Sequence, residues 1–386
     1  MAVSLSCLFV VNGLGLGNST RCHAVMEHLA EEGFKIHALT SGNGLAYLQG
    51  KACLSSITAM ESFFYSEKNG AISGWATLKS TIALAKIAKR KRAQLARLLE
   101  QLDPTVAVTD SEYATAPLRR RGVPIIGLNT SEIVVSEYLK CPRPPRDVRG
   151  HFWLVEFSDY LFHRRFCDLV LSPFPLRTAT RHQKFKRIGL VVRRSVLDRA
   201  RALGSRLLPS PRELREVVFM LSGSVHASNI NFSQRQFPFK IHVVGRSGES
   251  SGNVTYHGRQ MDNTELLCRA DALVINGGYS AVSEAFALGK PVFVVPVPGH
   301  AEQFVNASLV HNMGLGFMAT EADVLDQLLK AYESNAWTGL KQRPAGFELD
   351  GAREAAAAIA SLARSRSLSE QPVLMNAKPE VAKAQG

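Results

Sequence analysis

Short apolar runs alternate with longer stretches of helical spacing along most of the chain. The clearest case lies between residues 269 and 316, where an apolar run at 272–275 leads into Asn276-Gly277-Gly278 and a helical pattern that ends at Gly289. A second apolar run, PVFVVPV, begins at Pro291. A strand, a glycine turn, a helix and a further strand in this order form a parallel βαβ unit. The pattern therefore predicts an α/β fold.

The same alternation occurs in each half of the chain. Further strands are predicted at about residues 3–11, 34–40 and 106–109, and at 216–224, 239–245 and 253–258. A chain of 386 residues suits two domains of ordinary size. We predict two domains, formed by residues 1–190 and 191–364. The polar, proline-containing segment 365–386 is predicted to be disordered.

Three segments of the first half lie between these strands. Residues 75–102 have helical spacing and contain the basic run KIAKRKRAQLAR at 86–97. Residues 151–165 predict a helix rich in aromatic and basic side chains. Residues 129–149 have little periodicity and several prolines, so we predict a loop there.

Charge is distributed unevenly. The net charge is +13, and residues 1–190 hold 25 of the 46 basic residues but only 15 of the 33 acidic ones. A basic amphipathic helix can lie on an anionic lipid surface, although such a run is more often a solvated face of a packed helix. Peripheral contact with a membrane through this half of the chain is therefore kept as an alternative to a solvated helix face. Nucleic acid is not an expected partner, because no recognition motif accompanies the charge.

Other features of the sequence indicate a cytoplasmic protein. The six cysteines are scattered, without the spacing of a disulfide framework or a zinc site. No apolar run approaches the length of a membrane span. The apolar N-terminus lacks a basic start and continues into a glycine loop, so we interpret it as the first strand rather than a signal peptide.

Glycine turns at the ends of predicted strands are candidate phosphate sites. Backbone N–H groups at Asn276, Gly277, Gly278, Tyr279 and Ser280 would surround the N-terminus of the following helix, where an anion such as a diphosphate binds well. A second such turn is predicted at Gly223 and Ser224. Glu284 lies one helical turn beyond Ser280, within reach of two ribose hydroxyls.

The first glycine loop, from Asn12 to Arg21, departs from a dinucleotide-binding fingerprint. The spacing G-x-G-x-x-G fails at its last position, which is Asn18. Thr40 and Ser41 also stand where a carboxylate would hold an adenosine ribose. NAD binding is therefore a weak alternative.

The motifs NGLGLGNSTR at 12–21 and SEAFALGKPVFVVP…EQ…NA at 283–307 carry a family resemblance. The chain resembles nucleotide-sugar glycosyltransferases of the GT-B fold, in the bacterial branch that includes the peptidoglycan UDP-N-acetylglucosamine transferase. The resemblance implies an α/β fold of two Rossmann-like domains that face each other across a cleft, an N-terminal acceptor-side domain and a C-terminal nucleotide-sugar-binding domain. The resemblance runs through most of the chain. It implies an inverting, metal-independent transferase that uses a UDP-sugar, with no other cofactor, and a lipid-linked, envelope or small-molecule acceptor.

The resemblance also implies roles for residues of this chain. The loop around Met261 would clamp the nucleobase, while Glu302, Gln303 and Asn306 would hold sugar hydroxyls. The first glycine loop, with Gly15 and Gly17, would border the donor from the other domain. The segment 129–149 would face the acceptor.

One position departs from the family pattern. A histidine that faces the acceptor hydroxyl in the family is replaced by Asn18, whose amide cannot take a proton near neutral pH. Asp110 follows a predicted strand at the mouth of the sheet and is our first candidate for the general base, followed by Glu112 and His23. Asp110 could equally serve only as a helix cap.

Two other functions stay open. Epimerases and hydrolases of nucleotide sugars share this architecture and need no acceptor. A nucleotide-sugar-binding protein without catalytic activity is a further alternative, because Asn18 removes the expected imidazole. The absence of a D-x-D motif agrees with a donor site without metal.

Overall fold

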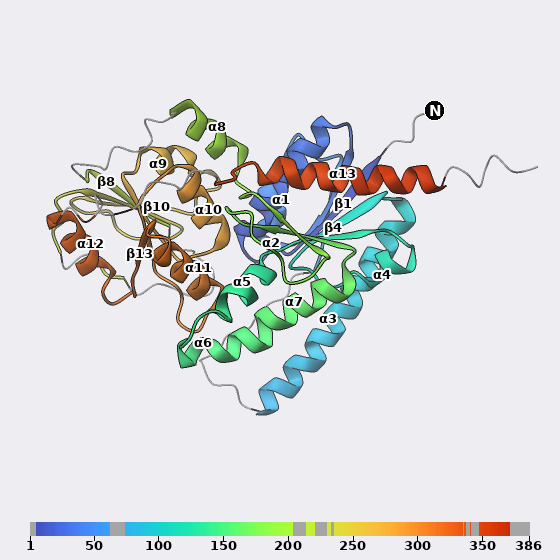
Figure 1. Ribbon diagram of the computed structural model, residues 1–386, viewed down its shortest axis with the longest axis horizontal. Helices are drawn as coiled ribbons and strands as arrows, with labels where there is room; N and C mark the ends of the chain where they lie inside the picture. Colours follow the sequence, from blue (N-terminus) through green and yellow to red (C-terminus); the bar gives the residue numbers. More distant parts are fainter. Residues whose placement is uncertain are drawn as a thin grey trace, which may run out of the picture.

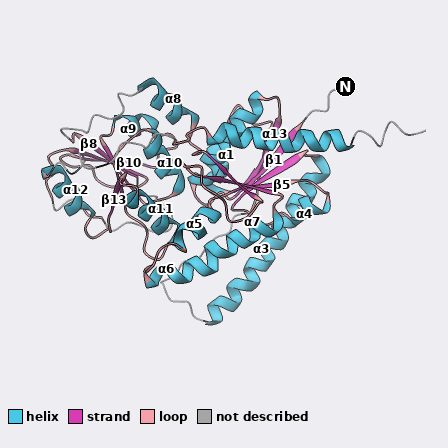
Figure 2. Cartoon of the chain, viewed as in Figure 1, coloured by secondary structure: helices cyan, strands magenta, loops and turns pink. Residues whose placement is uncertain are grey.

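The computed structural model describes residues 5–61, 74–203, 214–220, 230–232, 235–334, 336, 340 and 347–370. Within them the chain forms two lobes, each built around one parallel sheet with helices on both faces (Figures 1 and 2). The sheets have the order β3-β2-β1-β4-β5-β6-β7 and β10-β9-β8-β11-β12-β13. Two Rossmann-like lobes are what the family resemblance implies.

The N-lobe contains the seven-stranded sheet. Its strands are β1 (Ser6–Val11), β2 (Lys35–Thr40), β3 (Ser56–Ala59), β4 (Val106–Asp110), β5 (Ile125–Leu128), β6 (Leu169–Pro173) and β7 (Phe185–Ile188). Its helices are α1 (Leu16–Glu31), α2 (Gly42–Leu48), α3 (Gly74–Gln101), α4 (Ala116–Arg120), α5 (Ser131–Tyr138), α6 (Arg146–His151), the π-helix η1 (Phe152–Glu156) and α7 (Phe157–Phe166).

The C-lobe contains the six-stranded sheet. Its strands are β8 (Glu216–Met220), β9 (Lys240–Val244), β10 (Val254–Gly258), β11 (Ala272–Ile275), β12 (Val292–Val294) and β13 (Gly316–Met318). Its helices are α8 (Arg194–Leu203), α9 (Thr264–Arg269), α10 (Tyr279–Ala287), α11 (Ala301–Asn312) and α12 (Val324–Glu333). The central strands β11 and β12 are fully buried, as expected for a parallel sheet covered on both faces.

The last helix, α13 (Gly351–Glu370), returns to the N-lobe and packs on α1 (Figure 1). Its alanines lie in the same core as β1, β4 and α1. The sequence analysis placed residues 351–364 in the second domain and began the disordered tail at 365, whereas this helix covers the first sheet and continues to Glu370. The alanine-rich sequence of this helix contains little pattern of large apolar side chains, so it does not indicate which sheet the helix packs on. The small side chains allow the helix to approach the first sheet closely.

Two crossover segments join the lobes, one before α8 and one before α13. They lie against each other, because the backbone N–H of Leu190 donates to the carbonyl of Glu348 (2.7 Å) and that of Gly351 donates to the carbonyl of Leu190 (3.1 Å). A Cβ on Gly189 would lie 2.7 Å from the carbonyl oxygen of Glu348. The close contact of the two segments therefore requires glycine at this position.

Residues 129–149 are more ordered than the predicted loop, because they contain α5 and α6. Six of the eight residues of α5 are buried, including the polar Ser131 and Glu132, so the polar positions in the sequence do not mark one exposed face. The side-chain oxygen of Asn129 accepts a hydrogen bond from the backbone N–H of Ser131 (2.6 Å) at the start of α5. Burial on nearly all sides explains why the periodicity was absent.

The basic run on α3 divides between the surface and the interior. Lys86, Lys89 and Arg92 are exposed, whereas Lys91 is buried and forms an ion pair with Glu112 (2.7 Å). Across the described residues, no helix combines the length and apolar character that a membrane crossing needs.

Packing of α13 on the N-lobe can be tested with adjacent alanines on opposite faces. Ala356 is fully buried, and leucine there would overpack the core and lower the free energy of unfolding by about 1–3 kcal/mol. Ala357 is exposed, so Ala357→Leu serves as the control and should change it by less than about 0.5 kcal/mol. Chemical denaturation measures both, and equal effects would contradict the docking of α13.

Candidate active site

The two lobes meet where the first glycine loop faces the N-terminus of α10. The hydroxyl of Ser280 in the C-lobe donates to the carbonyl of Gly17 in the N-lobe (3.0 Å). Gly277 has a φ of 81°, and a Cβ there would lie 2.8 Å from Val294. A Cβ on Gly278, by contrast, would meet nothing within 4 Å. Gly277 therefore shapes the turn, while Gly278 leaves open space beside it.

Three predicted binding side chains hold the backbone around this turn. The amide of Asn306 donates to the carbonyl of Gly277 (2.9 Å), and that of Asn276 donates to the carbonyl of Val295 (3.3 Å). The side-chain oxygen of Gln303 accepts the backbone N–H of Val297 (2.9 Å). These contacts fix the shape of the glycine turn at 276–278, whereas Gln303 and Asn306 were predicted to hold sugar hydroxyls.

Glu284 lies on α10 as predicted, but it is buried against an arginine. Both of its carboxylate oxygens accept from Arg193, with the longer bond at 2.9 Å. Arg193 also donates to Asn263 (2.6 Å) and Asp262 (3.3 Å). Burial lowers the pKa of Arg193, but the Glu284 carboxylate outweighs it and raises the pKa above its ordinary value. Arg193 is thus a candidate site residue that the sequence did not identify.

Arg21 forms the centre of the site on the N-lobe side. It donates to both oxygens of Asp110 (2.6 and 2.9 Å) and to the side-chain oxygen of Asn18 (3.3 Å). Burial lowers the pKa of Arg21, but the Asp110 carboxylate outweighs it and raises the pKa overall. The thiol of Cys22 adds a further contact to Asp110 (3.4 Å). The Asp110 side chain is fully buried, and both of its carboxylate oxygens accept hydrogen bonds from Arg21.

Glu112 is held in a similar way. It accepts from Lys91 (2.7 Å) and from the backbone N–H of Tyr113 (3.1 Å). Ser111, which separates the two carboxylates, has a φ of 52° and is the only non-glycine residue with positive φ among those the structure describes. Such strain at a strand end is typical of functional sites.

His23, the third candidate base, lies apart from these groups. Its Nδ1 lies 3.4 Å from the hydroxyl of Tyr47. Burial lowers the pKa of His23 to about 4, so the imidazole is neutral at physiological pH.

Side chains of the N-lobe cap the N-terminus of α11 in the C-lobe. The backbone N–H of Gly299 donates to Asp147 (3.1 Å), and that of Ala301 donates to Nδ1 of His151 (3.4 Å). The backbone N–H of Glu302 donates to Glu156. The first N–H groups of a helix have no partner within the helix, so these bonds satisfy donors of one lobe with acceptors of the other. No sequence signal identified this contact, because the cap is far away in the chain.

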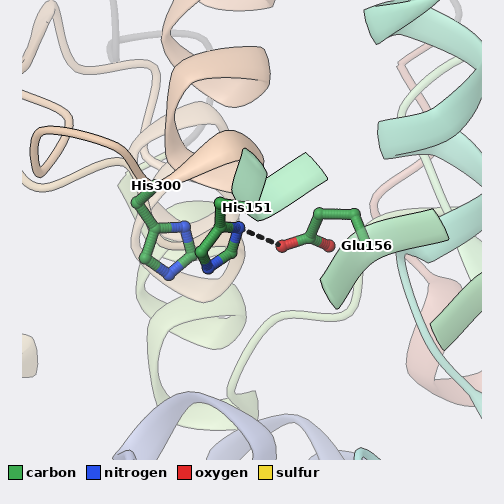
Figure 3. A group of neighbouring side chains, drawn as sticks. All are labelled: His151, Glu156 and His300. Atoms are coloured by element: carbon green, nitrogen blue, oxygen red, sulfur yellow. Dashed lines mark ion pairs between the residues drawn. The ribbon is translucent and has the colours of Figure 1, made fainter. Parts of the chain in front are cut away.

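Figure 3 shows the central part of this contact. The carboxylate of Glu156 points to the His151 ring, and the His300 ring lies beside it. Nδ1 of His151 is 3.5 Å from Glu156, and the centroids of the two imidazole rings are 4.6 Å apart. Burial lowers the pKa of His151 to about 4 and raises the pKa of Glu156 well above its usual range.

Glu302 reaches back to the N-lobe, where Thr130 donates to it (3.4 Å). Burial raises the pKa of Glu302, and the nearby Arg21 opposes that shift. Tyr279, at the start of α10, has the guanidinium of Arg21 over its ring at 5.5 Å. Burial raises the pKa of Tyr279 to about 12.

The loop predicted to clamp a nucleobase borders a hollow between α8 and α9. This hollow has a volume of about 680 Å³, and Gln260, Asp262 and Asn263 line it. Met261 is 42% exposed on the same loop. Arg259 donates to Asn43 of the N-lobe (2.7 Å). In the first glycine loop, a Cβ added at Gly15 would meet nothing within 4 Å. The predicted second phosphate turn, at Gly223 and Ser224, lies outside the described residues.

Comparison with known families agrees with this geometry. The sequence profile of glycosyl transferase family 1 matches residues 5–334. The chain belongs to glycosyl transferase family 1. It is thus a glycosyltransferase, and we expect a nucleotide-sugar donor and a sugar acceptor.

Relatives in this family share modest identity with the chain. An uncharacterized glycosyltransferase of Methanosarcina acetivorans is 23% identical over 90% of this chain and 96% of its own length. A UDP-N-acetylglucosamine–N-acetylmuramyl-(pentapeptide) pyrophosphoryl-undecaprenol N-acetylglucosamine transferase of Shewanella frigidimarina is 28% identical over 50% of this chain and 60% of its own length. A transferase of the same name from Bifidobacterium longum matches over only 22% of either chain, at 35% identity.

Solved glycosyltransferases share the fold. The MurG of Acinetobacter baumannii superposes with a TM-score of 0.59 and 16% identity, over 92% of this chain and 99% of its own. The calicheamicin glycosyltransferase CalG4 has a TM-score of 0.57 and 16% identity, over 97% and 100%. The two-lobed GT-B architecture is therefore shown.

The buried pair between Arg21 and Asp110 gives a stability prediction. Asp110→Asn removes one charge and leaves the Arg21 guanidinium buried without its partner, which should lower the free energy of unfolding by about 3 kcal/mol. Asp198→Asn is the control, because its pairs with Arg194 and Arg201 on α8 are exposed and contribute less than about 1 kcal/mol. Denaturant titration compares the two, and a cost at position 110 no greater than at 198 would contradict the buried pair.

Proposed function

We propose that this glycosyltransferase moves a sugar, GlcNAc or another hexose, from a UDP-sugar to an acceptor hydroxyl and inverts the anomeric centre. One observation carries the proposal: the N-terminus of α10 lies against the first glycine loop, to which Ser280 donates, and has open space at Gly278. Free N–H groups of a first helical turn and the helix dipole suit a diphosphate. The name of the Shewanella relative, which specifies UDP-N-acetylglucosamine, supports uridine as the nucleotide.

The nucleoside would bind beside α10, between Glu284 and the loop at 259–261. Glu284 would accept bonds from the ribose hydroxyls, while Arg193 holds its carboxylate in place. Met261 and its neighbours would cover the nucleobase from the adjacent hollow. Donors on the protein backbone and the α10 dipole would stabilise the departing diphosphate, so we propose that no metal bridges it.

The ion pairs of Asp110 and Glu112 disfavour both carboxylates as the acceptor of the hydroxyl proton. Asp110 and Glu112 are buried in ion pairs with Arg21 and Lys91, and this pairing favours a positioning role over proton abstraction. Asp110 would orient Arg21, which in turn holds Asn18 at the cleft. Glu302 fits the proton acceptor better, because it is half-buried beside Arg21 and burial raises its pKa. In this role it would take the proton of the acceptor hydroxyl as the sugar transfers.

The N-lobe carries an apolar surface that suits a lipid-linked acceptor. We define the apolar surface as five exposed side chains on η1 and α7: Trp153, Leu154, Val155, Leu161 and Phe166. Leu154 is 79% exposed, which is unusual for an apolar side chain of this size. Arg164 and Arg165 on α7 add positive charge beside it. We propose that this surface, together with exposed lysines of α3, contacts the cytoplasmic face of a membrane.

The donor site can be tested at Gly278. Gly278→Ala adds a methyl group in open space, so the fold should be unchanged, but the methyl would crowd the diphosphate and weaken UDP-sugar binding about tenfold. Isothermal titration with UDP-, dTDP- and GDP-sugars measures the affinity. Gly150→Ala is the control, because its Cβ also meets open space, on α6. Failure of every sugar to bind, or equal affinity in both variants, would rule out this donor site.

Membrane contact can be tested at Leu154. Leu154→Glu replaces a side chain that would be buried in lipid by a charged one, and should weaken binding to vesicles containing anionic phospholipid at least about tenfold. Met261→Glu is the control, because Met261 is an exposed apolar residue of the other lobe. Co-sedimentation measures both. The same loss in the control, or no vesicle binding by the unaltered protein, would contradict the apolar surface as the contact.

A further inference from the structure

Three side chains with metal-binding atoms converge at the junction of the lobes. His151 ends α6 and Glu156 ends η1, both in the N-lobe, while His300 precedes α11 in the C-lobe. One ligand atom from each lies within 4.8 Å of the others (Figure 3). Glu156 is buried and the two histidines are half-buried, so water does not fully surround the group.

The spacing of these atoms is close to that of a zinc coordination shell. Two ligands about 2.1 Å from one ion at a tetrahedral angle lie about 3.4 Å apart. Nδ1 of His151 and Oε1 of Glu156 are 3.5 Å apart. The imidazole of His300 brings one ligand atom within 4.8 Å of both, and its ring centroid lies 4.6 Å from that of His151. Nδ1 of His151 accepts the backbone N–H of Ala301, so an ion bound to this nitrogen replaces that hydrogen bond.

The surrounding charge is also suitable for a cation. Glu156 interacts electrostatically with the carboxylates of Glu302 and Asp159, so negative groups gather around the cluster. They offset the partial positive charge at the N-terminus of α11, which by itself disfavours a cation. Two imidazoles and one carboxylate favour a transition metal over Mg²⁺ or Ca²⁺, which prefer oxygen ligands.

We propose that His151, Glu156 and His300 form a binding site for one divalent transition-metal ion of the Zn²⁺ class, shared between the two lobes. Three protein ligands leave a coordination position for water. The ion fixes His300 to the N-lobe and thereby holds the start of α11, with Glu302 and Gln303, against the N-lobe. This site is separate from the donor diphosphate, and the inference does not depend on the proposed function.

The test is metal binding to the full chain after removal of metals with a chelator. Zn²⁺ is titrated in competition with a chromophoric chelator, and Co²⁺ absorption reports the ligand type. The unaltered protein should bind one ion. His300→Ala in the C-lobe and Glu156→Gln in the N-lobe should each weaken binding at least about tenfold, since even outer-shell changes at metal sites cost 10–100-fold. Circular dichroism verifies that each variant is folded.

His311→Ala is the matched control, because it removes an exposed histidine from the other end of α11. It should leave the affinity unchanged. Binding that is equally strong in all three variants would overturn the proposal, as would Co²⁺ spectra with thiolate charge-transfer bands from the free cysteines. Absence of stoichiometric binding would show that the cluster serves only as the cap of α11.

Discussion

Capping of α11 by the N-lobe is the contact on which the arrangement of the two lobes depends. A helix end buried at an interface must have its N–H groups satisfied, and here the acceptors are side chains of the other lobe. The same helix presents Glu302 to Thr130 and holds Gly277 through Asn306. The position of α11 relative to the N-lobe therefore sets both the reach of Glu302 and the shape of the glycine turn at 276–278.

Buried ion pairs organise the walls of the cleft. On the N-lobe side Arg21 and Asp110 support Asn18, and on the C-lobe side Arg193 supports Glu284. Each pair is costly to bury, so neither is explained by stability alone. Both instead hold a polar side chain in one orientation before a substrate arrives, which is the condition for effective positioning of reactants.

The sequence predicted the sheets and the glycine turn well, but not the contacts of the predicted residues. Strands such as 272–275 are short and continuously apolar, so they could be recognised locally, and Gly277 stood in a turn that requires its positive φ. The pairing of Asp110 with Arg21, 89 residues away, left no local trace. The caps on α11 and the docking of α13 on the N-lobe could not be predicted from local sequence either, because they depend on which surfaces meet after folding.

The paired crossover segments restrict how the cleft can open. Because the chain enters the C-lobe at 188–194 and leaves it at 347–351, and these segments are hydrogen-bonded to each other, the lobes are joined at a double connection rather than by a single flexible tether. A connection of this kind permits rotation about one axis and resists twisting or sliding. Any opening movement would therefore carry α10 and α11 away from the N-lobe together, so that the glycine turn at 276–278 and Glu302 would leave the N-lobe in a single motion.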